Sequence, residues 1–224
     1  MLQPRLDALP RSQRLLWPEL QSTPAGFVLY GGTGLALRLA HRESEDFDFF
    51  SSDRLDGESL LAEVPYLEDS EVVQRAENTL TCLVNRDGPV RVSFFGGLAL
   101  GRVQDPERVT GPGLLVASLL DLAATKVQVV QSRASAKDYL DVDAVIRLGG
   151  IDLGQALGAA TAVHGDRFNP VLTLKALTFF DDGDLSEVPA EVRDRLAAAV
   201  RGVNLEGLPS FPARKGLLAS RGSS

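Results

Sequence analysis

Residues 31–50 read GGTGLALRLAHRESEDFDFF. The apolar run at 27–30 comes before this stretch and is typical of a buried strand that ends at the glycine pair Gly31-Gly32. The residues that follow the glycines predict a helix with Thr33 as its cap. Residues 46–50 (DFDFF) then predict a second strand. The stretch therefore indicates an α/β unit in which a strand, a tight turn, a helix and a second strand follow one another directly.

The second of these strands carries two carboxylates. Side chains alternate along a strand, so Asp46 and Asp48 are expected to share one face. Two like charges on one face repel each other, and a divalent cation removes that repulsion. Mg²⁺ is commonly held by one or two carboxylates together with substrate phosphates. The alternative is that the two aspartates lie at an exposed strand edge without any ligand.

The glycine pair suits a phosphate. Helix N-termini offer N–H groups and the positive end of the helix dipole, and glycine lets a ligand approach the backbone closely. A phosphate cradle with metal-binding carboxylates is the minimum set for phosphoryl or nucleotidyl transfer. The glycines match neither G-x-G-x-x-G nor G-x-x-x-x-G-K-[ST], so neither a Rossmann nor a P-loop site is supported. The simpler alternative is that Gly31-Gly32 is only a tight turn.

Outside this stretch the chain divides into an α/β front half and a helical back half. A hairpin is predicted at 80–95, because apolar residues alternate on both sides of Asp87-Gly88. Gly and Pro at 96–113 mark a connection, and Gly149-Gly150 ends a helix. We expect helices at 1–24, 58–64, 118–132, 137–148, 153–163, 170–180 and 189–200.

Two further clusters lie in the helical half, DLAATK at 121–126 and RASAKDYLD at 133–141. Both contain a possible capping box, Ser118 to Asp121 and Ser135 to Asp138, which is a sufficient structural account of each aspartate. Lys126 is harder to explain, because its helix is otherwise built of apolar or small residues. Its stem can extend to water, or its ammonium can meet a phosphate.

Composition sets broad limits. The chain has 224 residues, a net charge of −7 and one cysteine, Cys82, so an internal disulfide and a Cys/His zinc site are not expected. An acidic protein binds nucleic acid only through a local basic patch. Basic residues near the C-terminal end offer one, although solvated helix faces explain them as well. No apolar run spans a bilayer and no signal peptide is expected, which predicts a cytoplasmic protein without a membrane partner.

Four motifs carry a resemblance to a known family. They are the stretch 31–50, DLAATK at 121–126, KDYLD at 137–141 and LTLKALTFFDD at 172–182. In this order they resemble the AbiEii-type abortive-infection family of nucleotidyltransferase toxins. The stretch 31–50 has the pattern of the polymerase-β superfamily, in which a glycine and a small residue precede a helix and then D-x-D.

The resemblance implies an α/β (α+β) fold of the polymerase-β-like nucleotidyltransferase type, a mixed sheet with flanking helices followed by a helical C-terminal half. We expect an α/β core at 1–112, a helical part at 113–205 that contributes Lys126 and Asp138 to the site, and a flexible tail at 206–224.

The implied reaction is a Mg²⁺-dependent (or Mn²⁺-dependent) transfer of a nucleotide from a nucleoside triphosphate, with release of pyrophosphate. The implied acceptor is an RNA such as tRNA, or a protein. Proteins of this kind act as toxins with a cognate antitoxin, in type IV-like toxin–antitoxin or phage-defence pairs.

The resemblance also implies roles for individual residues. The metal ligands would be Asp46 and Asp48, which with Lys126 and Asp138 form the expected catalytic set. Lys126 would bind phosphate, and Asp138 would orient groups or assist proton removal. The expected nucleotide contacts are Gly31, Gly32, Thr33, Arg42, Ser44 and Lys137. For Arg42 an equally natural explanation is an arginine at the negative end of a helix dipole.

One position departs from the superfamily pattern. A third carboxylate is usual on a later strand, and the matching segment here, residues 90–95, has Ser93 where an aspartate is expected. A neutral hydroxyl is a poor base and a weak metal ligand. Either Asp138 takes over part of that role, or the protein is a catalytically weakened module that still binds nucleotide. A purely structural partner protein, which binds no nucleotide, is a third hypothesis.

Overall fold

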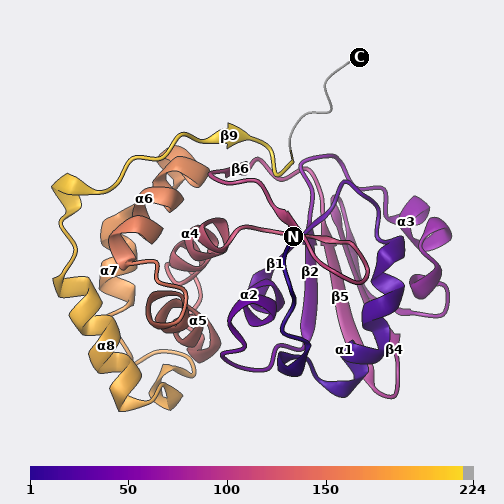
Figure 1. Cartoon of the computed structure of the whole chain (residues 1–224), viewed down its shortest axis with the longest axis horizontal. Helices are drawn as coiled ribbons and strands as arrows, with labels where there is room; N and C mark the ends of the chain where they lie inside the picture. The colour runs from indigo at the N-terminus through magenta and orange to yellow at the C-terminus, as the bar shows by residue number, and fades with distance from the viewer. Residues whose placement is uncertain (219–224) are drawn as a thin grey trace. The chain divides into compact units, whose positions relative to one another are not determined.

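The computed structural model describes residues 1–218 (Figure 1). The chain forms two compact units. The first comprises residues 1–100, 105–118 and the segment that begins at Lys215, and the second comprises residues 101–104 and 119–214. The first unit holds a seven-stranded sheet and the second is mainly helical.

The large sheet has the strand order β3-β4-β5-β2-β1-β8-β7. It is mixed: β1 pairs antiparallel with β2 and parallel with β8, and β2 pairs parallel with β5. The strands are β1 (Val28–Tyr30), β2 (Asp46–Phe50), β3 (Glu71–Ala76), β4 (Thr79–Asn85), β5 (Pro89–Phe95), β7 (Glu107–Arg108) and β8 (Leu115–Val116). The helices of the first unit are η1 (Leu6–Ala8), α1 (Arg11–Leu16), η2 (Trp17–Ser22), α2 (Gly31–Leu39), α3 (Gly57–Glu63) and η3 (Pro65–Leu67).

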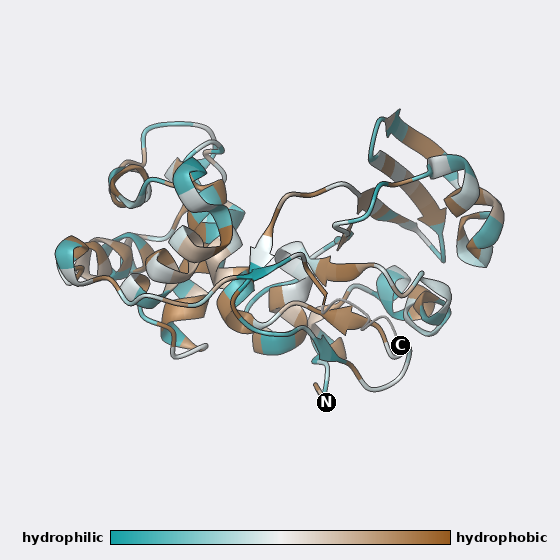
Figure 2. Cartoon of the chain, turned by 90° about the horizontal axis from the view of Figure 1, so that it is seen from above, coloured by the Kyte–Doolittle hydropathy of each residue, from teal (hydrophilic) through white to brown (hydrophobic). Residues whose placement is uncertain are grey.

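One face of this sheet forms the hydrophobic core. Phe47 and Phe49 of β2 are fully buried there with Phe94 of β5, and Phe49 stacks on Phe94 with ring centroids 5.3 Å apart. Trp17 packs over the same face, its ring centroid 6.3 Å from that of Phe47. Burial of each large side chain contributes on the order of 2 kcal/mol. Figure 2, coloured by hydropathy, shows that several strands of this sheet are mainly apolar. The core therefore occupies one face of β2 and leaves Asp46 and Asp48 on the other.

The second unit packs helices around buried polar contacts. Tyr139 donates from its hydroxyl to the Ala176 carbonyl (2.9 Å), and Thr173 donates to the Val127 carbonyl (2.6 Å). Its helices are α4 (Leu119–Val129), α5 (Ala136–Arg147), α6 (Leu153–His164), η4 (Gly165–Arg167), α7 (Pro170–Ala176), η5 (Leu185–Glu187), α8 (Ala190–Arg201) and η6 (Leu205–Gly207). The short strands β6 (Gly101–Arg102) and β9 (Arg214–Lys215) form a two-stranded pair.

The structure confirms the mixed sheet with flanking helices and the helical C-terminal part. The hairpin predicted at 80–95 is β4 and β5, and the strand predicted at 46–50 is β2. The helix expected at 1–24 is instead three pieces, η1, α1 and η2. Part of the tail expected at 206–224 lies beyond residue 218 and outside the described residues. Within residues 1–218, no helix is long and apolar enough to cross a bilayer.

Two capping predictions are wrong. Helix α2 begins at Gly31 with Tyr30 at the N-cap, so Thr33 lies inside the helix and does not cap it. Ser135 is the N-cap of α5, but its side chain makes no capping hydrogen bond. In both cases a buried polar network, described below, uses the side chains that local sequence assigned to capping.

Candidate active site

The turn between β1 and α2 has no room for side chains. Gly31 adopts φ +68°, and a Cβ atom on it would collide with the carboxylate of Asp48. A Cβ on Gly32 would lie 2.6 Å from a guanidinium nitrogen of Arg42 and 2.9 Å from the Ser44 hydroxyl. Close approach therefore favours glycine at both positions, and at Gly31 the positive φ favours it as well. The structure brings Asp48, Arg42 and Ser44 together at the start of α2.

The two carboxylates of β2 share a face, as the sequence predicted. Phe47 and Phe49 point into the core, while Asp46 is exposed and Asp48 is half-buried on the opposite face. Asp48 lies against Gly31, where the N–H groups and positive dipole end of α2 begin. The shared face and the contact with the glycine turn are the two geometric conditions that a cation-and-phosphate site on this strand has to meet.

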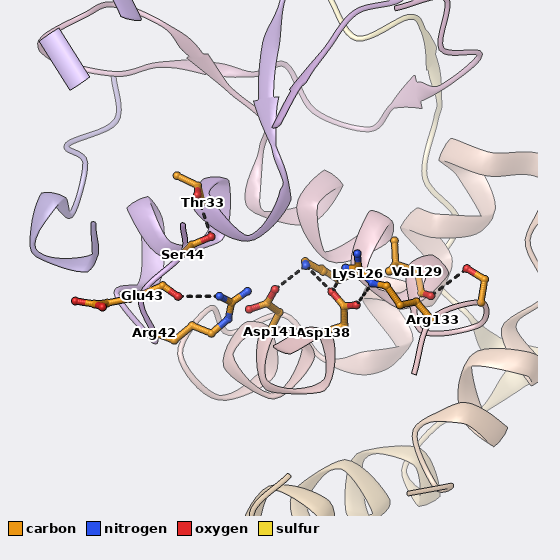
Figure 3. Close-up of polar contacts among 10 residues, drawn as sticks. Thr33, Arg42, Glu43, Ser44, Lys126, Val129, Arg133, Asp138 and Asp141 are labelled. Atoms are coloured by element: carbon orange, nitrogen blue, oxygen red, sulfur yellow. Dashed lines mark hydrogen bonds and ion pairs between the residues drawn. The ribbon is translucent and has the colours of Figure 1, made fainter. Parts of the chain in front are cut away.

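Thr33 and Ser44 point inward. Both are buried, and their hydroxyls lie 2.9 Å apart (Figure 3). The Thr33 hydroxyl also contacts the backbone carbonyl of Asp46. A hydroxyl has one proton, so Thr33 donates to that carbonyl and accepts from Ser44. These contacts tie α2 to the first residue of β2, and they support a positioning role for both hydroxyls.

The guanidinium of Arg42 lies at the N-terminal end of α2, whereas attraction by the helix dipole would place it at the C-terminal end. Its guanidinium approaches Gly32 in the first turn, and it donates to the Glu43 carbonyl at 2.8 Å (Figure 3). An arginine attracted by the helix dipole would lie near the C-terminal residues of α2. The guanidinium of Arg42 therefore lies beside the glycine turn, and its phosphate contact stays a prediction.

The neighbouring strand β5 completes this face of the sheet. Its register places Ser93 beside Asp48 and Arg91 beside Asp46. Ser93 is buried and accepts a hydrogen bond from the Thr81 hydroxyl (3.3 Å). The position expected to hold a third carboxylate therefore adjoins Asp48 but carries a serine. No group of three or more His, Cys, Asp or Glu side chains within residues 1–218 is arranged to hold a metal ion.

The helical unit contains a separate buried charge cluster. The Lys126 ammonium lies 2.8 Å from Asp138 and 2.6 Å from Asp141, and all three side chains are buried. Arg133 binds both oxygens of Asp138, at 2.6 and 2.8 Å (Figure 3). Two cations and two carboxylates balance, so the charge of Lys126 is compensated inside the protein. Lys137, also predicted to contact nucleotide, is exposed on α5 and lies outside this set.

The cluster decides the protonation of Asp138. Burial acts to raise its pKa, but the hydrogen bond from Arg133 and the charge of Lys126 outweigh burial and hold the pKa below its ordinary value. A carboxylate with a lowered pKa is a weak base at neutral pH. Of the two roles predicted for Asp138, these surroundings favour the orienting role over proton removal.

Sequence reasoning missed Asp141 and Arg133. Asp141 follows Asp138 by three residues on a helix, which places both carboxylates on one face toward Lys126. This spacing of three residues was the sequence signal that could have identified Asp141 as a second partner of Lys126. Asp121 accepts from the N–H groups of Val103 (2.7 Å) and Gln104 (3.1 Å), which gives it a role in holding residues 103–104.

The described geometry agrees with a comparison against protein families. The family model described as nucleotidyl transferase AbiEii toxin of the type IV toxin–antitoxin system matches residues 15–214. This chain belongs to the AbiEii family. The match contains the glycine turn, the two aspartates of β2 and the buried cluster of the helical unit.

This AbiEii protein is similar to a sequence relative and to two solved structures. An uncharacterised protein of Aquifex aeolicus (strain VF5) is 30% identical over 158 residues, which cover 70% of this chain and 74% of the relative. Among solved structures, MenT4, a nucleotidyltransferase toxin from Mycobacterium tuberculosis H37Rv, superposes with a TM-score of 0.57 and 18% identity, covering 86% of this chain and 81% of MenT4. A candidate nucleotidyltransferase from H. pylori superposes with a TM-score of 0.55 and 16% identity, covering 85% of this chain and 92% of the H. pylori chain. These two structures show the shared nucleotidyltransferase fold.

Proposed function

We propose that this AbiEii protein transfers a nucleotide from a nucleoside triphosphate to an RNA acceptor, with tRNA as the first candidate. The observation that carries the proposal is the contact between Asp48 and Gly31 at the first turn of α2. It combines a carboxylate, a second carboxylate on the same face and a helix N-terminus in one place. In metal-assisted transfer from a triphosphate, carboxylates can hold the metal and a helix N-terminus can bind the phosphates.

The donor set fits Mg²⁺ or Mn²⁺. Carboxylate oxygens are the ligands that these hard cations prefer, and Mg²⁺ retains several waters and substrate phosphate oxygens beside one or two carboxylates. Asp46 and Asp48 would hold the ion. A bound divalent cation would neutralise charge on the phosphates and polarise the bond that is broken.

The chain's own residues would bind and orient the substrate. The glycine turn would place backbone N–H groups against the phosphates, and Arg42 beside Gly32 would add a positive charge. Thr33 and Ser44 would fix the start of β2 through their buried hydrogen bonds. Ser93 is neutral at physiological pH, so we expect a low turnover for any acceptor whose hydroxyl must lose a proton.

The direct test is a screen of the four labelled nucleoside triphosphates against total tRNA and against total protein, with Mg²⁺ or Mn²⁺. We expect label in the tRNA fraction. Label in protein alone would replace the RNA acceptor by a protein acceptor. The family description also implies an antitoxin, so co-expression with the neighbouring gene should restore growth if this chain is toxic alone.

Ser93 favours a second candidate function. Without the third carboxylate, such a protein would retain only nucleotide binding, as a catalytically weakened module. Calorimetry with each triphosphate and Mg²⁺ separates the two functions. Binding without incorporation into either tRNA or protein supports the weakened module, whereas incorporation supports the enzyme.

A further inference from the structure

The face of the sheet that carries the two aspartates also carries an arginine, Arg91. Strand β5 runs parallel to β2 and places Arg91 beside Asp46 and Ser93 beside Asp48. The Nε atom of Arg91 lies 3.7 Å from Oδ1 of Asp46. The two side chains are 49% and 51% exposed, so this ion pair is solvated and weak. A stronger ligand for either partner can therefore separate them.

The charges on this face differ from those of a three-carboxylate site. Sites that hold two divalent cations clamp both the attacking and the leaving oxygen, and several carboxylates must balance the charge of the ions. Here β2 and β5 supply two carboxylates and one guanidinium, and Arg42 adds a second guanidinium beside Gly32. Two carboxylates suit one divalent cation, and the two guanidinium groups leave no negative charge to hold a second.

We propose that Arg91 is a substrate-contacting residue of this site and that the site takes one divalent cation per chain. Arg91 supplies toward the phosphates the positive charge that a second ion supplies in a site with three carboxylates. The inference rests on the proposed nucleotidyl transfer and adds a residue to that site. The planar guanidinium offers a fork of N–H donors that matches phosphate oxygens, which lysine does not.

In this proposal the carboxylate of Asp46 binds either Arg91 or the divalent cation. When Asp46 ligates a cation, Arg91 loses its partner and its guanidinium can turn to a phosphate. Without nucleotide, Arg91 competes with the cation for Asp46. Removal of Arg91 should therefore strengthen metal binding and weaken nucleotide binding, and a residue with a purely structural role would not change the two affinities in opposite directions.

The test is a Mn²⁺ titration followed by electron paramagnetic resonance, with and without α,β-methylene analogues of the four nucleoside triphosphates. The variants are Arg91→Gln, Arg91→Lys and, as control, Arg75→Gln. Arg75 lies in β3 of the same sheet, pairs with Glu58 at 2.6 Å and is also 49% exposed. Circular dichroism and thermal unfolding check that each variant folds.

For the wild type we expect one Mn²⁺ per chain in the presence of the analogue. For Arg91→Gln we expect Mn²⁺ to bind about fivefold more tightly without nucleotide, because a positive charge about 4 Å from the carboxylate is gone. The analogue should bind the same variant at least about tenfold more weakly, because charge-assisted hydrogen bonds are lost. Arg91→Lys should recover part of the analogue affinity, and Arg75→Gln should match the wild type.

Two Mn²⁺ ions per chain, or an Arg91→Gln variant with unchanged analogue affinity, would overturn the inference. Asp48→Asn separates this failure from that of the proposed function. If the wild type binds one Mn²⁺ that Asp48→Asn abolishes and Arg91→Gln changes nothing, only the role of Arg91 is wrong. If the wild type binds no Mn²⁺ and no analogue, the proposed function fails, and the role of Arg91 with it.

Discussion

At the scale of single residues, the site depends on an absent side chain. Gly31 allows the Asp48 carboxylate to lie against the first turn of α2, and any Cβ there would displace it. The sequence predicted the glycine turn and the two aspartates separately. Only the structure shows that they touch, because strand alternation predicts a face but not a distance to another element.

Gly31→Ala should reduce nucleotide incorporation and Mn²⁺ affinity by more than tenfold, through displacement of Asp48. Its free energy of unfolding should fall by at least about 1 kcal/mol, because alanine is strained at positive φ. Gly150→Ala is the matched control, since Gly150 has φ +67° and no atom within 4 Å of an added Cβ. Equal activity of the two variants would show that the contact with Asp48 has no functional role.

Lys126 provides a second residue-scale prediction. Lys126→Met would leave the buried carboxylates of Asp138 and Asp141 without their shared cation. The free energy of unfolding should fall by about 3–5 kcal/mol, as measured by urea denaturation. The control Lys137→Met replaces an exposed lysine of α5 and should change stability by less than about 0.5 kcal/mol. A Lys126→Met variant as stable as this control would contradict the buried pairing.

Local sequence also gave a wrong prediction for one residue, Asp138. The spacing of Ser135 and Asp138 is that of a capping box, yet Asp138 pairs with Lys126 and Arg133. A capping box and a buried ion pair use the same residue types. They differ in what lies across from the helix, which only tertiary structure supplies.

At the scale of elements, the sequence pattern predicted a strand correctly where one of its faces is buried. Strand β2 alternates between exposed or half-buried aspartates and buried phenylalanines, and its bounds match the prediction. Strand β3 was missed, since all six of its residues are exposed and it lies at the edge of the sheet. An edge strand with no buried face carries no alternation that a sequence can show.

Helix α6 ends at a histidine that makes stability depend on pH. Burial, and next the charge of Arg167, lower the pKa of His164 from 6.5 to about 4. The folded chain keeps His164 neutral, whereas the unfolded chain binds a proton below pH 6.5. This contribution to stability is therefore present above pH 6.5 and is lost as the pH falls toward 4.

Urea denaturation at pH 7 and pH 5 checks this prediction. The wild type should lose roughly 2 kcal/mol more stability between these values than His164→Gln, which has no group to titrate at that position. An equal loss in both proteins would show that His164 titrates alike in the folded and unfolded states.

At the scale of the whole molecule, the order of the motifs predicted the fold class, and the mixed sheet and the superposition on MenT4 confirm it. Net charge is less informative. The chain carries −7, and two arginines of the basic C-terminal region are already engaged: Arg195 with Asp143 (2.7 Å), and Arg193 with the Val188 carbonyl (2.7 Å). If the acceptor is an RNA, as proposed above, a local set of cations has to bind it, and its affinity should fall steeply with salt.

The central claim is that Asp46 and Asp48 form the seat of nucleotidyl transfer. The most direct measurement compares label incorporation from the four nucleoside triphosphates by the wild type, Asp48→Asn and the control Asp87→Asn. Asp87 is an exposed aspartate paired with Arg11 in the first unit, remote in sequence from the glycine turn. We predict that Asp48→Asn lowers incorporation by several orders of magnitude while Asp87→Asn leaves it unchanged. Incorporation by Asp48→Asn at the wild-type rate would contradict the account.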